Sequence, residues 1–115
     1  MRNLSIHLLL AATTTATAAP ASSCPPTDSS LVMLSNFTTS QRYAEACGVA
    51  QIAVERVVTS NIKQLRVCLE ARKVPAAKID EAVRNGNALA DHMLPTMRQD
   101  PAFCTRFKDD FGKAG

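Results

Sequence analysis

The sequence lacks tryptophan and contains few other aromatic residues. One tyrosine and four phenylalanines make up 4% of its 115 residues. The core must therefore be built mainly from Ala, Val, Leu and Ile. The chain is long enough for one domain, because two cores would leave both halves too small to bury enough apolar surface. Hydrophobic residues at 46% and charged residues at 20% are typical of a folded globular protein and not of a disordered chain.

The patterns of several common active sites are also missing. There is no Gly-rich phosphate loop, no G-x-S-x-G and no H-E-x-x-H, and no two of the four cysteines form a C-x-x-C pair. His7 lies in the leader segment described below, which leaves His92 as the one histidine for Ser-His or Cys-His chemistry. We therefore predict that the protein is not an enzyme and has no catalytic, cofactor-binding or metal-binding residues.

His92, Met93 and Met97 form the one group with donor atoms for a soft metal ion or a haem iron. A histidine near the end of a helix is ordinarily a surface residue, and methionines one helical turn apart ordinarily fill a core. We expect no ligand role for these three side chains.

The first residues have the order of a cleavable signal peptide. Arg2 gives a positive start, residues 4–12 give an apolar run, and residues 16–21 contain two A-x-A patterns. The apolar run is far shorter than the ~20 residues that a membrane span needs. We expect residues 1–21 to be removed and the mature chain to be exported, either periplasmic or secreted, without a transmembrane span.

The charges of the mature chain do not point to nucleic acid. Without Arg2, 12 Lys and Arg side chains are interspersed with 10 acidic ones and form no basic block. Asn36-Phe37-Thr38 fits the N-glycosylation pattern, which would apply only in a eukaryotic source.

We divide the mature chain into a lead-in, residues 22–38, and a helical domain, residues 39–115. Two prolines make the start of the lead-in extended, and residues 29–37 can hold a short helix. Thr39 or Ser40 can cap a long helix over residues 41–74, with Gly48 as a break near its start. A strand over residues 52–58 is the alternative, but two charged residues interrupt its alternation. The apolar positions of the helix step by three or four: Cys47, Ala50, Val54, Val58, Ile62, Leu65 and Leu69.

A second long helix is predicted after Pro75, with Pro95 ending or kinking it. Asp100 and Pro101 then read as the start of a last helix that Gly112 can close. The apolar positions of the second helix are Ile79, Ala82, Val83, Gly86, Ala90, Met93 and Met97, and those of the last are Phe103, Phe107 and Phe111. The fold class is thus all-α: a disulfide-stapled antiparallel helical hairpin with one or two short flanking helices.

Four cysteines in an exported chain predict two disulfides. A continuous helix would hold Cys47 and Cys68 about 30 Å apart, at ~1.5 Å per residue, which is too far for a bond. In a hairpin centred on Pro75, Cys47 lies opposite Cys104, and Cys24 is left for Cys68. The alternative for Cys24 is lipidation, since residues 21–24 loosely resemble a bacterial lipobox with Ala in place of the usual Leu.

The function expected from these features is binding. A signal peptide, four cysteines and a helical hairpin are similar in architecture to several small bacterial periplasmic families, including helical immunity proteins that neutralise cell-wall-degrading toxins; no motif carries this similarity. We expect a protein partner, with the chain acting as an inhibitor, immunity factor, adaptor or secreted effector. The alternative is a small-molecule carrier with an apolar pocket lined by residues such as Met93, Met97 and Phe107.

Overall fold

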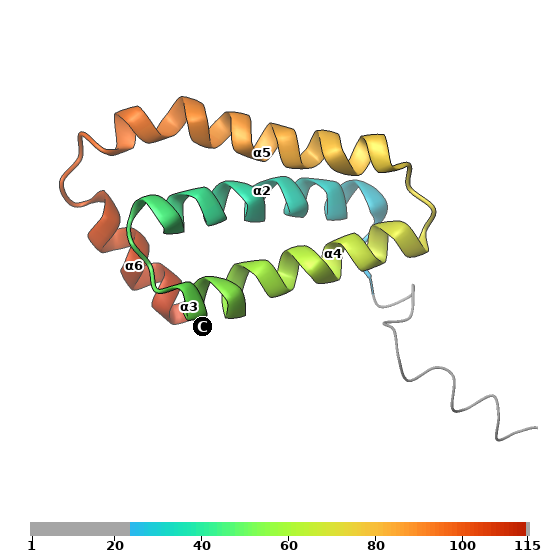
Figure 1. Ribbon diagram of the computed structural model, residues 1–115, viewed down its shortest axis with the longest axis horizontal. Helices are drawn as coiled ribbons and strands as arrows, with labels where there is room; N and C mark the ends of the chain where they lie inside the picture. The colour runs from blue at the N-terminus through green and yellow to red at the C-terminus, as the bar shows by residue number, and fades with distance from the viewer. Residues whose placement is uncertain (1–23, 115) are drawn as a thin grey trace, which may run out of the picture.

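The computed structural model describes residues 24–114, and every regular element in that range is helical (Figure 1). The all-α class is therefore confirmed. The expected signal peptide, residues 1–21, lies outside the described residues. None of the helices within residues 24–114 is long and apolar enough to cross a membrane.

The described chain forms four helical segments. The second of them changes type along its length, because a π-helical turn, η2, separates two α-helical parts. In chain order the elements are α2 (Thr27–Ala46), α3 (Gln51–Val54), η2 (Glu55–Thr59), α4 (Ser60–Ala71), α5 (Ala76–Met97) and α6 (Phe103–Ala114).

The three long segments form an up-down-up bundle in which α2 lies between α4 and α5 (Figure 1). α2 and α5 run in the same direction, because Thr39 bonds to Gly86 and Arg42 to Asp91, at separations of 47 and 49 residues. The segment from α3 to α4 runs the other way. α6 folds back across the end of the bundle at which α2 and α5 finish (Figure 1).

The antiparallel hairpin is present but wider than the sequence suggested. α4 and α5 contact each other little, since α2 occupies the space between them. The turn between them begins with a Schellman motif: Lys73 has a positive φ of 63°, and the Val74 N–H donates to the Leu69 carbonyl. Pro75 follows as the N-cap of α5, and its carbonyl accepts from the amides of Lys78 and Ile79.

The predicted helix over residues 41–74 is interrupted at Gly48, the residue at which the sequence suggested a break. Gly48 has φ 71°, and its N–H donates to Glu45 while the Val49 N–H donates to Ala44, which is again a Schellman motif. Residues 41–46 therefore belong to α2, and the helical segment starts anew at Gln51. The strand alternative over residues 52–58 is also excluded, because these residues lie in α3 and η2.

The boundary between lead-in and helical domain at residues 38 and 39 falls inside α2, so that division is wrong. Residues 29–37 are helical, but as the middle of a helix that begins at Thr27 after Pro26. Neither Thr39 nor Ser40 is an N-cap. The Thr39 hydroxyl instead donates to the carbonyls of Ser35, at 3.1 Å, and Gly86, at 2.8 Å.

The last third of the chain departs from expectation at Gly112, which lies inside α6 instead of ending it. Of the two alternatives for Pro95, an end of the helix is excluded, because α5 runs past it to Met97. The start of α6 follows the prediction more closely. Asp100 Oδ1 accepts from the Ala102 N–H at 2.9 Å, and Pro101 has no N–H to satisfy.

The core consists of two clusters. One lies toward the α4–α5 connection and contains Leu34, Leu65, Leu69, Ile79 and Ala82. The other lies toward α6 and contains Ala44, Val54, Val58 and Phe111. Phe37 and Ile62 pack against both clusters and make them continuous.

The packing of α2 on α5 depends on small side chains. A Cβ added to Gly86 would lie 2.4 Å from the Ser35 carbonyl oxygen and 2.8 Å from Thr38 Cβ. The hydroxyls of Thr38 and Thr39 are buried there and donate to backbone carbonyls, so their burial leaves no donor unpaired. This close contact fixes how the two parallel helices meet and shapes the groove between them.

Candidate functional site

The structure contains both disulfides in the expected pairing. Cys24, just before α2, bonds to Cys68 in α4 with the two Cα atoms 5.7 Å apart. Cys47, just after α2, bonds to Cys104 in α6 with a Cα separation of 5.2 Å. No cysteine among the described residues is free. The first bond uses the Cys24 sulfur that lipidation would need, so the lipobox alternative is not supported.

Arg72 fixes the start of α2 beside the first disulfide. Its guanidinium donates to the carbonyl of Cys24 at 2.9 Å and to that of Pro25. A charged donor on two carbonyls is a strong anchor, because hydrogen bonds from ionised groups are about twice as strong as neutral ones. The segment expected to be a loose lead-in is therefore held on α4.

The three donor residues considered in the sequence all lie on α5. His92 is exposed on α5, whereas Met93 and Met97 are half-buried on the same helix. Within residues 24–114 no three His, Cys, Asp or Glu side chains lie together in a way that could hold a metal ion. Neither methionine lines either of the two pockets described next.

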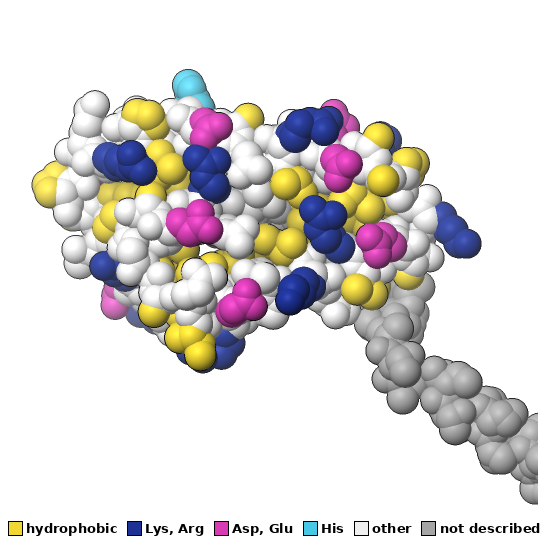
Figure 2. All heavy atoms as spheres, viewed as in Figure 1, with side chains coloured by type: hydrophobic (Ala, Val, Ile, Leu, Met, Phe, Trp, Pro, Cys, Tyr) yellow, Lys and Arg dark blue, Asp and Glu magenta, His cyan; other side chains and the backbone are white. Residues whose placement is uncertain are grey.

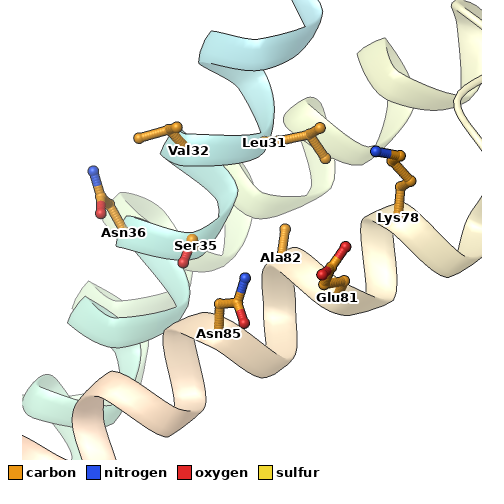
Figure 3. Close-up of a pocket in the computed structure, with 8 residues that line it drawn as sticks. All are labelled: Leu31, Val32, Ser35, Asn36, Lys78, Glu81, Ala82 and Asn85. Atoms are coloured by element: carbon orange, nitrogen blue, oxygen red, sulfur yellow. The ribbon is translucent and has the colours of Figure 1, made fainter.

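The first pocket is an open groove of about 330 Å³ between α2 and α5, which we call the α2–α5 groove (Figure 3). Three of its lining residues are apolar, and the others carry hydroxyl, amide or charged groups. Figure 3 shows Ala82 and Asn85 of α5 directed toward α2. The lining residues are Leu31, Val32, Ser35 and Asn36 from α2, and Lys78, Glu81, Ala82 and Asn85 from α5.

The second pocket has a volume of about 230 Å³ and lies beneath α6, where α6 crosses α2 and η2. We call it the aromatic pocket, because three phenylalanines and two valines form most of its wall. Its lining residues are Phe37 and Ser40 from α2, Val57 and Val58 from η2, and Phe107, Asp110, Phe111 and Ala114 from α6.

Tyr43 of α2 and the three phenylalanines of α6 form a row of contacting rings that continues into the aromatic pocket. Tyr43 meets Phe103 and Phe107 edge to face at centroid distances of 5.7 and 6.1 Å, and Phe107 lies 5.6 Å from Phe111. Burial raises the pKa of the Tyr43 hydroxyl above its ordinary value of 10.0, so it stays protonated at neutral pH. The spacing of the phenylalanines predicted their common face, whereas their contact with η2 depends on the turn at Gly48.

The charged side chains of α6 and of the turn before it differ in whether they are paired. Asp109 forms an ion pair with Lys113 at 3.4 Å, and Arg106 pairs with Asp100 at 2.6 Å. Asp110 belongs to none of the ion pairs of residues 24–114. The aromatic pocket therefore has an unpaired carboxylate among its lining residues.

Figure 2 shows Lys and Arg side chains alternating with Asp and Glu over the viewed face, with hydrophobic atoms between them. Basic and acidic side chains are thus interspersed on this face. No protein-family model, curated protein or solved structure matches the chain.

Proposed function

We propose that the chain is an exported binding protein that recognises another protein through the α2–α5 groove. Two disulfides are typical of an oxidising compartment, and they agree with the signal peptide expected from the sequence. The observation that carries the proposal is the groove of about 330 Å³, with Val32 beside it 59% exposed.

The groove has the composition of a protein interface. Its lining combines apolar side chains, such as Leu31 and Ala82, with the amide and charged groups of Asn85, Lys78 and Glu81. Protein interfaces commonly combine an apolar centre with a polar rim. Val32 adds exposed apolar surface to this lining.

Rigidity adds to this argument. Both ends of α2 are tied by disulfides, and its middle is packed on α5 without a gap at Gly86. A surface that is already ordered loses little conformational entropy when it binds. This favours a preformed groove over a segment that folds only on its partner.

Photo-crosslinking in the organism that makes the protein tests the proposal. A photoreactive amino acid replaces Val32, and the matched control carries it at Ile52, a 70% exposed apolar residue of α3 at the other end of the bundle. We expect one discrete heavier adduct from position 32 and none from position 52. Asn85→Arg, which places a long charged side chain in the groove, should suppress the adduct.

Three outcomes would overturn the proposal: no protein adduct at position 32, equal adducts at both positions, or an adduct of twice the chain's own mass. The last result would assign the groove to self-association. Circular dichroism of each variant separates loss of binding from loss of the fold.

Of the three residues that we expected to line a small-molecule pocket, only one lines either of the pockets described above. Phe107 lines the aromatic pocket, but Met93 and Met97 do not. Both pockets also open on to the surface, whereas a carrier is expected to enclose its ligand. The aromatic pocket is nevertheless a separate feature with its own chemistry.

A further inference from the structure

The aromatic pocket differs from the α2–α5 groove in its chemistry. Its wall is formed by the rings of Phe37, Phe107 and Phe111 together with two valines. Ser40 and Asp110 supply its polar side chains, and Asp110 is its one charged lining residue. An apolar ligand without charge would use the wall but would leave the carboxylate unused.

The local backbone supports a binding role for this pocket. Val57 and Val58, two consecutive residues, both line it, and both belong to the π-helical turn η2. π-helical turns are rare and occur frequently at functional sites. The turn places a second wall opposite the rings of α6.

The electrostatics favour a cation. Asp110 is exposed and is not engaged by any Lys or Arg of residues 24–114. The face of an aromatic ring carries negative potential and attracts a cation that lies over it. A carboxylate and three phenyl rings around one pocket therefore favour a positively charged group that also has apolar substituents.

We propose that the aromatic pocket binds a small organic cation of the alkylammonium class. Its alkyl groups contact Phe107, Phe111 and the valines of η2, and its charged nitrogen lies within reach of the Asp110 carboxylate. The volume of about 230 Å³ suits a compact group such as a trimethylammonium and not a long chain. The inference does not depend on the α2–α5 groove, because the two pockets share no lining residue.

The test uses two probes of the same shape. Choline carries a trimethylammonium group, and 3,3-dimethylbutan-1-ol is its uncharged carbon counterpart. Each is titrated into the oxidised protein while the methyl signals of Val57 and Val58 are followed by NMR. We expect saturable shifts with choline and affinity at least about five-fold weaker for the alcohol, the factor for loss of one partly screened charge contact. Added salt should weaken only choline binding.

Two carboxylate variants separate a specific contact from general charge. Asp110→Asn and Asp109→Asn change the net charge equally, but only Asp110 lines the pocket. We expect Asp110→Asn to weaken choline by about five-fold and leave the alcohol unchanged, and Asp109→Asn to leave both unchanged. Phe107→Leu keeps an apolar side chain without the ring and should weaken choline more than the alcohol.

Each contrary result counts against the inference. Equal affinity for the two probes would show that the charge of choline does not contribute to binding. Equal effects of the two Asn variants would show that Asp110 makes no specific contact. A choline titration without shifts at either valine would show that choline does not bind in this pocket. Melting temperatures of the three variants show whether any loss reflects unfolding instead. A failed crosslink at Val32 would leave these results unaffected, so the two proposals fail independently.

Discussion

Replacing Gly86 by alanine tests the close packing of α2 on α5. In most helices this change stabilises the fold by about 1 kcal/mol, because alanine loses less backbone entropy than glycine. At position 86 the new Cβ would lie 2.4 Å from the Ser35 carbonyl oxygen, about 1 Å inside ordinary contact. A backbone oxygen cannot rotate away, so the two helices must separate.

The cost of that separation can be worked out term by term. Overpacking a well-filled interior costs about 1 to 3 kcal/mol. Moving the helices apart also stretches the 2.8 Å bond from the Thr39 hydroxyl to the Gly86 carbonyl, whose loss costs about 1 kcal/mol. After the helix-propensity gain, the net loss is about 1 to 3 kcal/mol. For a domain of this size the melting temperature should fall by roughly 5 to 20 °C.

The assay is thermal and urea unfolding followed by far-ultraviolet circular dichroism. Two other glycines serve as controls. Gly112 lies in α6, where an added Cβ would have no neighbour within 4 Å, so Gly112→Ala should be neutral or slightly stabilising. Gly48 has equal space but φ 71°, so Gly48→Ala should destabilise by about 1 kcal/mol through its backbone alone. A Gly86→Ala protein as stable as the original would refute the packing argument.

The remaining predictions concern cysteine, histidine and an acidic cap. Thiol titration of the denatured, unreduced protein should read near zero, and two reactive thiols per chain would contradict this prediction. Cys104→Ser should expose the Cys47 thiol and lower the free energy of unfolding by about 4 kcal/mol, the value of the chain-entropy model for a 57-residue separation. His92→Ala removes only an exposed side chain and should change the free energy of unfolding by less than about 0.5 kcal/mol in urea, with a larger loss implying an unseen contact. Hydrogen bonds from Arg106 and the Ala102 amide lower the pKa of Asp100 below 3.8, so this cap stabilises the fold above that pH and the contribution is lost as the pH falls further. In an NMR titration Arg106→Gln should move the Asp100 pKa back toward 3.8, and an unchanged value would contradict the assignment.

The full extent of α2 was not predicted from the sequence. Ser and Thr favour caps and turns, so residues 27–40 suggest a lead-in with a short helix over residues 29–37, followed by a cap at Thr39 or Ser40. In the structure those side chains are satisfied inside the helix. Ser30 donates to Pro25, and Thr38 donates to Leu34. Their small size also allows the approach to Gly86, which only the tertiary structure reveals.

The disulfide pairing followed from the sequence although the hairpin that suggested it is incomplete. Cys47 was placed on a continuous first arm that lies opposite Cys104. In fact Cys47 follows α2, and Cys104 follows α5. The pairing holds because α2 and α5 are parallel and end at the same end of the bundle, a relation that no count along the chain contains.

The two pockets lay beyond sequence reasoning for a similar reason. Both arise where α2 meets another element, and the sequence did not predict that residues 27–46 form one helix. The periodicity of α6 did place Phe107 on an apolar face, but Met93 and Met97 share a helix with each other and not a pocket with Phe107. The spacing of apolar residues predicts which side chains share a helix face, but not which element that face packs against.

The interleaved order of the two disulfides has a consequence for proteolysis. Cys24–Cys68 and Cys47–Cys104 overlap along the chain, so one of them spans every peptide bond from residue 24 to residue 104, and both span residues 47 to 68. A protease that cuts once in this range leaves two pieces that remain one covalent molecule. Outside the cytoplasm, where reducing agents are scarce and proteases are common, a nicked chain would thus keep its parts together and retain the means to reclose its bundle.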